Sequence, residues 1–327
     1  MKLYQDVDYL GGDFMAMIKY IILRFIWMAI GLFLIMSLVF ITTRAAHVNV
    51  WFVHMNFPDD LWFVLNDYRQ FVINVFTKWD WGVVDGKPVW DTLLETAPIT
   101  LKLNLIAFVF YFPVGLIIGS LTALKAHSIF DKVVSGILLV LGSIPNFIWI
   151  FLFIIFFGYT IAILPPQPPS IQAPLYWRIA GWVMPVAALS LAPIAKFSGM
   201  MRSELIENFD ADYLLLLRTK GLSRKQAMTR HVIRDSIIPI MPEIAPTFVF
   251  VIVGSFFVEM IYNMSGVATL LFRSMFRPGG GFYYIAINTP MTVMICTFYA
   301  TITLFFIFLM DILYAIVDPR IRIGKKK

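Results

Sequence analysis

Charged residues are scarce in this chain of 327 residues: only 14% are Asp, Glu, Lys or Arg, while 60% are hydrophobic. A soluble protein is about 25% charged. Three stretches contain no charged residue at all, namely residues 103–124, 133–177 and 278–310. Each exceeds the roughly 18 apolar residues that mark a membrane span. The composition excludes an ordinary soluble enzyme and predicts an all-α protein that crosses a membrane several times.

Residues that bind metals, cofactors or nucleotides are equally sparse. Cys296 is the single cysteine, so this chain alone can form no disulfide and no cysteine-based zinc or iron–sulfur site. The closest histidines, His47 and His54, lack a standard ligand spacing. The phosphate-binding pattern GxxxxGK[ST] does not occur, and the spans hold no cluster of nucleophile and acid or base. We therefore expect no catalytic residue, metal or cofactor in this chain.

Six apolar segments are long enough to be spans. They cover about residues 18–42, 100–124, 133–159, 179–194, 242–262 and 290–317. The first is longer than the core of a signal peptide and no clean cleavage site follows it, so we expect a retained helix. A proline-rich run at residues 164–169 ends the third span.

The distribution of Lys and Arg predicts the orientation. One side of the predicted spans holds 18 of the 26 Lys and Arg residues, eight of them in segment 196–238. The positive-inside rule places this side, with both termini, in the cytoplasm. Topology thus explains the net charge of +6, and no nucleic-acid partner is expected. The predicted division is 1–42 (N-terminus and first helix), 43–99 (extracytoplasmic insert), 100–317 (membrane core) and 318–327 (basic cytoplasmic tail).

The extracytoplasmic insert contains one predicted helix, from Pro58 to about Thr77. Its apolar residues recur at spacings of three and four behind a proline suited to a first helical turn. Tryptophans nearby favour a helix that lies along the outer membrane–water boundary. Packing on the spans as a lid is the equally weighted alternative.

The cytoplasmic segment 196–238 predicts two short helices around a glycine turn. Gly221 suits the left-handed position that stops a helix, and Ser223 with Gln226 has the spacing of a capping box for the next. Residues 214–217 are four consecutive leucines, which a surface helix exposes unless something covers them. A protein partner is the favoured cover. A hairpin folded on its own spans and a DNA-binding helix-turn-helix are the alternatives, the latter opposed by tethering at the bilayer.

This segment resembles the cytoplasmic loop of ABC importer permeases. Only Gly221 matches the general loop pattern of that family, but the oligopeptide, dipeptide and nickel permease branch fits much better. The matching loop residues are Asp212-Tyr213, Arg218, Lys220-Gly221-Leu222-Ser223, Arg230-His231, Arg234 and Pro239. Elsewhere the matches are Trp81-Gly82, Ser143-Ile144-Pro145, Phe147, Trp149, Val258-Glu259, Asp311–Ala315 and Asp318–Arg322, so the resemblance covers about residues 15–323.

The resemblance implies a permease of the type I importer kind, with six spans, in a bacterial cell membrane. It further implies a second homologous permease, two ATPases that bind ATP and Mg²⁺, and an extracytoplasmic peptide-binding protein. Peptides are the expected cargo, with nickel or a metal chelate as the alternative. The residues expected to couple to the ATPases are Asp212, Tyr213, Leu216, Leu217, Arg218, Lys220, Gly221, Leu222, Ser223 and Arg224.

Two outward segments depart from the family pattern. Residues 263–268 replace a run resembling Trp-Pro-Gly-Leu-Gly, and residues 277–281 form an unusual Arg-Pro-Gly-Gly-Gly sequence. Both lie on the side where a binding protein docks in the family, so cargo and receptor are less specified than the ATPase-facing loop.

Polar residues within the spans are candidates for the translocation path or a gate. Asn104, Pro145, Asn146 and Glu259 form this set, while Asp311 suggests a structural role near the cytoplasmic end. Pro145 with Asn146 predicts either carbonyls freed toward a cavity or a simple kink. Glu259 predicts a gate or a solvated cap. An ion-coupled secondary transporter is a further alternative, but it requires a coupling-ion site that one charged membrane residue fits poorly.

Overall fold

A computed structural model describes residues 3–48, 59–209, 221, 226, 232–279, 282–285 and 287–317. The chain divides into two compact units. Unit 1 comprises Met1–Leu101 and Met264–Phe308, and unit 2 comprises Lys102–Asn263 and Leu309–Lys327. Two long helices, α3 (Val89–Leu124) and α12 (Thr289–Val317), contribute residues to both units.

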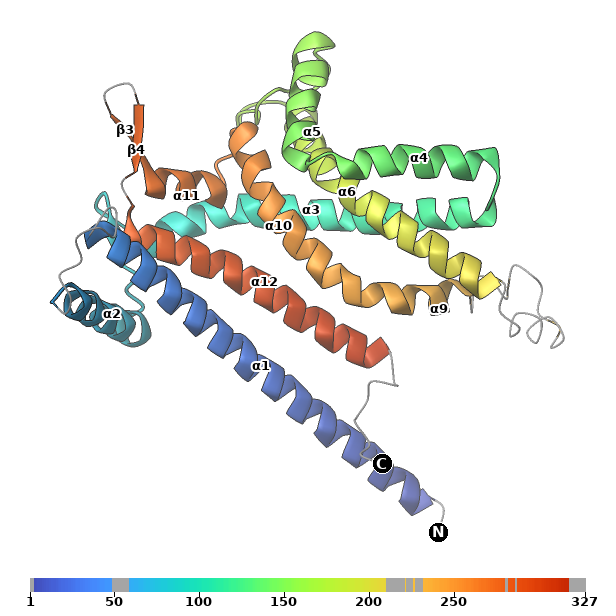
Figure 1. Cartoon of the computed structure of the whole chain (residues 1–327), viewed down its shortest axis with the longest axis horizontal. Coiled ribbons are helices and arrows are strands. Elements are labelled where there is room, and N and C mark those ends of the chain that lie inside the picture. The colour runs from blue at the N-terminus through green and yellow to red at the C-terminus, as the bar shows by residue number, and fades with distance from the viewer. Residues whose placement is uncertain are drawn as a thin grey trace. The chain divides into compact units, whose positions relative to one another are not determined.

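Unit 1 combines long apolar helices with two small hairpins (Figure 1). In β1–β2, Val83 pairs with Pro88, and in β3–β4, Phe276 pairs with Ile285, both antiparallel. The elements of the unit besides the parts of α3 and α12 are α1 (Leu3–Val48), α2 (Asp59–Lys78), β1 (Val83–Val84), β2 (Lys87–Pro88), α11 (Val267–Met275), β3 (Phe276–Gly279) and β4 (Phe282–Ile285).

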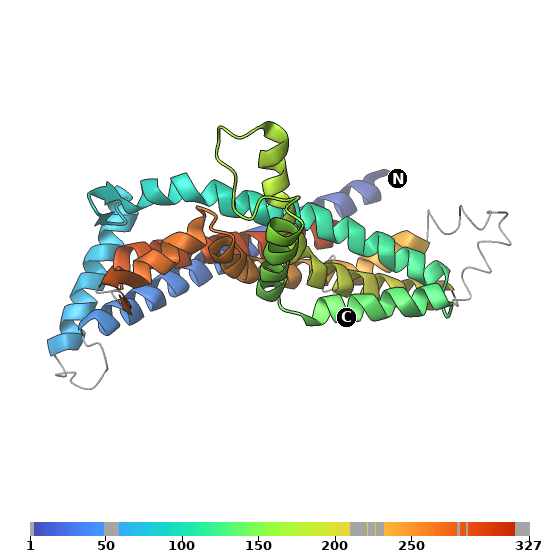
Figure 2. The same cartoon turned by 90° about the horizontal axis from the view of Figure 1, so that it is seen from above.

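Helix α2 confirms the helix predicted within segment 43–99, and it packs across the end of α1 (Figure 2). Arg44 of α1 forms an ion pair with Asp67, and the Ser37 and Tyr68 hydroxyls are 2.6 Å apart. The rings of Phe40 and Phe71 stack with centroids 4.5 Å apart. One face of α2 is thus held by α1, as the lid interpretation predicts. The opposite face of α2 exposes apolar side chains, and Trp62 is 74% exposed. This face is therefore free to contact the membrane boundary, as the other interpretation predicts.

Unit 2 is built around α6 (Leu175–Phe209), whose length covers the predicted fourth span and continues 15 residues past it. The helix includes Pro185 and Pro193 and has a mostly buried central face. The other elements of the unit, besides the parts of α3 and α12, are α4 (Ile129–Ser143), α5 (Asn146–Phe153), the π-helix η1 (Ile154–Thr160), α9 (Ile233–Ile237), the 3-10 helix η3 (Ile238–Glu243) and α10 (Ile244–Ile261).

Small residues allow α3 and α6 to approach closely. A Cβ atom at Gly115 would lie 2.9 Å from Phe197 Cβ, and one at Gly119 would lie 2.5 Å from the Ser198 carbonyl oxygen. Both distances are shorter than real contacts permit. The spacing of four places both glycines on one helix face, the arrangement by which membrane helices bring their backbones together.

The structure confirms the predicted membrane helices and changes the third. Five helices are long and apolar enough to span a membrane, and α4 with α5 and η1 forms a sixth, broken candidate. The two parts meet at 98° (Figure 1), so the predicted span over residues 133–159 is sharply broken near Pro145. Pro145 explains the break, because it has no N–H to continue the backbone ladder. Beyond η1 the chain forms an irregular, proline-rich loop that returns to α6 (Figure 2).

Candidate functional site

Two contacts form a clamp between α6 and the helices that follow residues 210–231. Asn208, near the end of α6, donates a 2.8 Å hydrogen bond from Nδ2 to Ser236 Oγ of α9. Twelve residues earlier in α6, Lys196 Nζ lies 2.8 Å from Glu243 Oε2 at the end of η3. These contacts join the chain segments on either side of residues 210–231.

A second connection joins α6 to α4. The Arg202 guanidinium donates to both carboxylate oxygens of Asp131, at 2.6 and 2.7 Å. Asp131 is only 2% exposed and also accepts a 2.9 Å hydrogen bond from the backbone N–H of His127. Such a two-bond pair fixes both position and orientation. It therefore fastens the start of α4, and the short loop before it, to the C-terminal half of α6.

The predicted coupling residues lie almost entirely outside the described residues. These are Asp212, Tyr213, Leu216, Leu217, Arg218, Lys220, Leu222, Ser223 and Arg224. Gly221 is described: it is exposed and has φ +84°, and a Cβ there would have nothing within 4 Å. The prediction of a left-handed glycine is thus confirmed. Most residues with a Cβ rarely adopt this conformation, so backbone geometry and not lack of space favours glycine at position 221.

At the break between α4 and α5, a side-chain hydrogen bond replaces a missing backbone hydrogen bond. Pro145 cannot donate to the Leu141 carbonyl, the partner it would have in a continuous helix. The indole Nε1 of Trp149 donates to that carbonyl instead, at 3.1 Å. The Leu141 carbonyl therefore has a side-chain donor, and the bend of 98° exceeds an ordinary kink, while carbonyls freed toward a cavity stay a prediction.

Asn146, the first residue of α5, is held against α10. The position that a Cβ would occupy at Gly254 coincides with the Asn146 side-chain amide, whose Cγ would be 3.0 Å away. Asn146 is half-buried, while Pro145 is exposed. The two path candidates thus lie at a contact between α5 and α10, and Pro145 has access to the surroundings of the chain.

The other two path candidates are buried within the chain. Asn104 of α3 is 3% exposed and donates a 3.0 Å hydrogen bond to Ser255 Oγ of α10. Glu259 of α10 is 0% exposed, so its interpretation as a solvated cap is wrong. The nearby Tyr262 hydroxyl donates to the Pro165 carbonyl at 2.6 Å, which ties this end of α10 to the proline-rich loop. These positions join α10 to its neighbours within unit 2.

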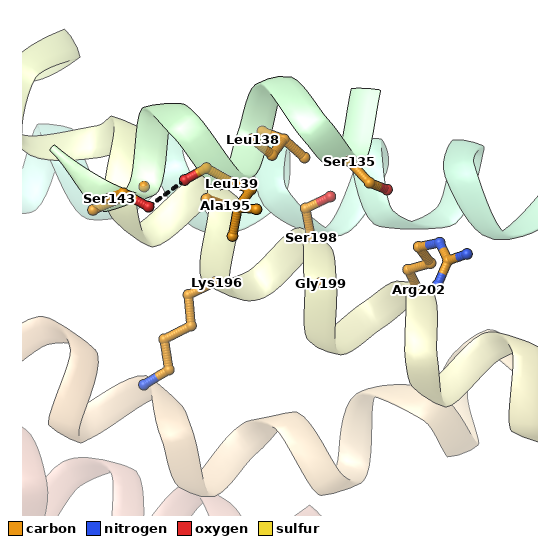
Figure 3. A pocket seen from close by; sticks show the side chains of 11 residues that line it. Ser135, Leu138, Leu139, Ser143, Ala195, Lys196, Ser198, Gly199 and Arg202 are labelled. Carbon is orange, nitrogen blue, oxygen red and sulfur yellow. Dashed lines mark hydrogen bonds between the residues drawn. The ribbon is translucent and has the colours of Figure 1, made fainter. Parts of the chain in front are cut away.

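Sequence reasoning did not identify Asp131, Arg202, Lys196, Glu243 or Ser236 as functional residues. One local signal was available: the Ser128 hydroxyl accepts from the Asp131 N–H at 3.2 Å, which caps α4. That pattern predicts the start of a helix but says nothing about an ion pair with a residue 71 positions away. A cavity of about 400 Å³ between α4 and α6, with Lys196 and Arg202 at its wall, was missed for the same reason (Figure 3).

Comparisons with known proteins agree with this architecture. Residues 115–323 match the family described as binding-protein-dependent transport system inner membrane component. The dipeptide transport system permease protein DppB of Lactococcus lactis subsp. cremoris is 30% identical, over 94% of this chain and 100% of that protein. The oligopeptide transport system permease protein OppB of Haemophilus influenzae is 25% identical, over 94% and 100%.

A solved structure shares the fold. The MetNI methionine ABC transporter, crystallised in inward-facing conformations, has a chain that superposes with a TM-score of 0.53 at 16% identity. The match covers 69% of this chain and 96% of that chain. With the family match over residues 115–323 and the full-length relatives, the chain belongs to the inner membrane components of binding-protein-dependent transport systems, the permease subunits of ABC importers.

Proposed function

We propose that this permease imports dipeptides or oligopeptides through a bacterial cytoplasmic membrane. The observation that carries the proposal is the match, over nearly the whole chain, to relatives named as dipeptide and oligopeptide permeases. Nickel, the alternative cargo, has no such support. The chain forms half of the path, and a second, homologous permease forms the other half.

Energy for transport comes from two ATPase subunits beneath the cytoplasmic segment. Both termini lie in the cytoplasm, as the 18 Lys and Arg residues on that side favour. ATP and Mg²⁺ bind the ATPases, and this chain transmits their closure as mechanical force. The Asn208–Ser236 and Lys196–Glu243 contacts support this, because they connect both ends of the segment to membrane helices. An extracytoplasmic binding protein delivers the peptide at the opposite face.

The test is Gly221→Val in the complete importer, reconstituted in liposomes with its ATPases and binding protein. A β-branched residue at φ +84° strains the turn, so we expect peptide uptake to fall at least tenfold while ATP hydrolysis continues. Gly221→Asn is the matched control, because asparagine tolerates the left-handed conformation, and it should retain most of the uptake. Unchanged uptake by Gly221→Val contradicts the coupling role. Absence of ATP-driven peptide uptake by the unmodified complex contradicts the cargo.

A further inference from the structure

Unit 1 contains a second cavity, with a volume of about 540 Å³. The β1–β2 hairpin, the first turn of α3, helix α11, the start of β3 and the start of α12 surround it, and every lining residue belongs to unit 1. Figure 1 shows α11 beside the β3–β4 hairpin. Leu270, Phe276 and Met291 give the cavity an apolar lining, and its charged residues are Asp85, Lys87 and Arg273.

The β1–β2 hairpin directs Lys87 toward this cavity. Lys87 pairs with Val84 across the hairpin, so the two side chains rise from the same face. Val84 packs against the buried core of the unit, whereas Val83, on the opposite face, is 61% exposed. Asp85 and Gly86 have φ values of 51° and 78°, as in the tight two-residue turn that fixes a hairpin. Lys87 therefore extends from the inner face of a short, well-defined hairpin.

Helix α11 places Arg273 at the rim of the cavity. Leu270, Arg273 and Ser274 line the cavity at spacings of three and four, so they share one face of α11. On this face Leu270 packs against the core and Ser274 is 4% exposed, while Arg273 is exposed. The guanidinium thus belongs to the edge of the lining that solvent reaches.

Hydrogen bonds hold the walls of the cavity together. The Asn288 N–H donates to the Ser274 carbonyl at 2.7 Å, and the Ser274 and Thr292 hydroxyls are 3.1 Å apart. At the other end of α11, the Val267 N–H donates to Thr100 Oγ1 of α3 at 2.9 Å. Helix α11 is therefore fixed to both α12 and α3. A cavity formed in this way exists before any partner arrives, which lowers the entropic cost of binding.

The two cations of the cavity are available to a partner. Among the residues that the structure describes, neither Lys87 nor Arg273 forms an ion pair or a side-chain hydrogen bond, and Asp85 forms none either. Arg44, in the same unit, is by contrast paired with Asp67. Unpaired cations at the rim of a concave surface attract carboxylates and accelerate the association of an oppositely charged surface.

The first turns of α3 show which medium surrounds the cavity. Asp91 and Glu95 are exposed charges that precede the charge-free stretch of residues 103–124, and hydrocarbon does not solvate such groups. Thr92, which lines the cavity, lies eleven positions before residue 103, about 16 Å along the helix. In the orientation proposed above, this end of α3 faces the extracytoplasmic side. Water and soluble proteins therefore reach the cavity more readily than acyl chains do.

We infer that the cavity bounded by Lys87 and Arg273 receives an acidic loop of the extracytoplasmic binding protein. The two cations steer and hold carboxylates of that loop, and the apolar lining around Leu270 accommodates a neighbouring side chain. The inference rests on the proposed import function. It adds the place on this chain where the binding protein docks and the sign of the charge that it presents.

The test measures docking through ATP hydrolysis. The complete importer is reconstituted in nanodiscs, and peptide-loaded binding protein is titrated at several salt concentrations. In Lys87→Gln/Arg273→Gln, we expect the half-saturating concentration of binding protein to rise about tenfold at low salt, with the maximal rate retained. The salt dependence of that concentration should also weaken, because fewer charges remain to be screened.

Two matched variants separate this effect from misfolding and from general electrostatics. Lys87→Arg/Arg273→Lys keeps both charges and should keep the half-saturating concentration. Arg69→Gln/Lys78→Gln removes two exposed cations of α2 that do not line the cavity and should keep it as well. Carbodiimide coupling gives a second readout, because it joins the Lys87 amine to a nearby carboxylate. Mass spectrometry should identify an acidic segment of the binding protein in the product, and Lys87→Arg should abolish that product.

Several results would overturn the inference. One is an unchanged half-saturating concentration in Lys87→Gln/Arg273→Gln, and another is an equal rise in the α2 control. A change that tracks the anionic lipid content of the nanodiscs would identify a lipid site instead. A variant that only alters the preference between a peptide acid and its amide, at saturating binding protein, would identify a cargo site.

Failure of this inference differs from failure of the proposed function. If the unmodified complex shows no ATP-driven peptide uptake in liposomes, the proposed function fails. If uptake proceeds and the half-saturating concentration ignores Lys87 and Arg273, only the docking inference fails.

Discussion

At the scale of single residues, Gly254 leaves no room for added volume unless Asn146 shifts. The Asn146 amide occupies the space that a Cβ at this glycine would need. We predict that Gly254→Ala destabilises the permease by about 1–3 kcal/mol, the usual range for overpacking. Thermal unfolding of the purified protein in detergent measures the effect. Gly136→Ala is the matched control, because a Cβ at Gly136 has nothing within 4 Å, and it should leave the midpoint unchanged or slightly raised.

Trp149 provides a second prediction at this scale. Its indole N–H donates to the Leu141 carbonyl, which Pro145 leaves without a backbone donor. Trp149→Phe keeps a ring but removes the donor, so we expect a loss of about 1–3 kcal/mol, as for other polar groups left unsatisfied. Denaturant unfolding followed by circular dichroism measures it. Trp27→Phe alters an indole that is 67% exposed and should change stability little. Equal effects of the two substitutions on stability would contradict a stabilising hydrogen bond from Trp149 to the Leu141 carbonyl.

At the scale of elements, the Asp131–Arg202 pair determines how α4 meets α6. Asp131→Asn removes the charge that neutralises Arg202, whose side chain is 28% exposed. We expect a loss of stability of about 1–3 kcal/mol, because an unpaired cation is left partly buried. Asp131→Asn/Arg202→Met should recover most of the loss, since the remaining charge is gone. Asp85→Asn, at an exposed turn position with φ 51°, is the control. A double variant no more stable than the single one would show that the pair is not the link.

Elements with local signals were predictable. Apolar spacing behind Pro58 predicted a helix to about Thr77, and α2 covers Asp59–Lys78. The left-handed conformation of Gly221 followed from its place after two cationic residues. The size of the bend at Pro145 did not follow, because a proline predicts a break but not its angle, and the Asn146 contact with Gly254 joins residues far apart in the chain. The length of α6 was underestimated, because Lys196 and Arg202 suggested a loop, whereas both charges are paired within the helical structure.

For the whole molecule, sidedness is the property that the remaining prediction tests. Ser223 lies in the segment predicted to be cytoplasmic, and Cys296 is the only native cysteine. In a Cys296→Ser background, Ser223→Cys should react with an impermeant thiol reagent in inverted vesicles and not in intact cells. It should also crosslink to an ATPase subunit. Thr77→Cys, at the end of α2, is the reciprocal control and should react from outside. Labelling of Ser223→Cys in intact cells would reverse the topology.

Parts of the candidate site were predictable only where their residues lie close together in the sequence. The glycine turn is encoded within a few positions, so sequence reasoning found it. The clamp at its base was invisible, since Asn208 meets Ser236 across the loop and Lys196 meets Glu243 across 47 positions. Nothing local distinguishes these residues from other polar groups near the end of a span.

The break between α4 and α5 also affects the surrounding lipid. With 15 residues, α4 extends about 22 Å, less than the roughly 30 Å of a hydrocarbon core. Because α5 leaves it at 98°, α5 adds little length in the same direction. Where α4 meets lipid, its exposed apolar side chains, such as Ile137 and Val140, therefore create hydrophobic mismatch, which a bilayer relieves by thinning at a cost that grows with each ångström. Shorter acyl chains thus reduce the mismatch along α4, and longer ones increase it.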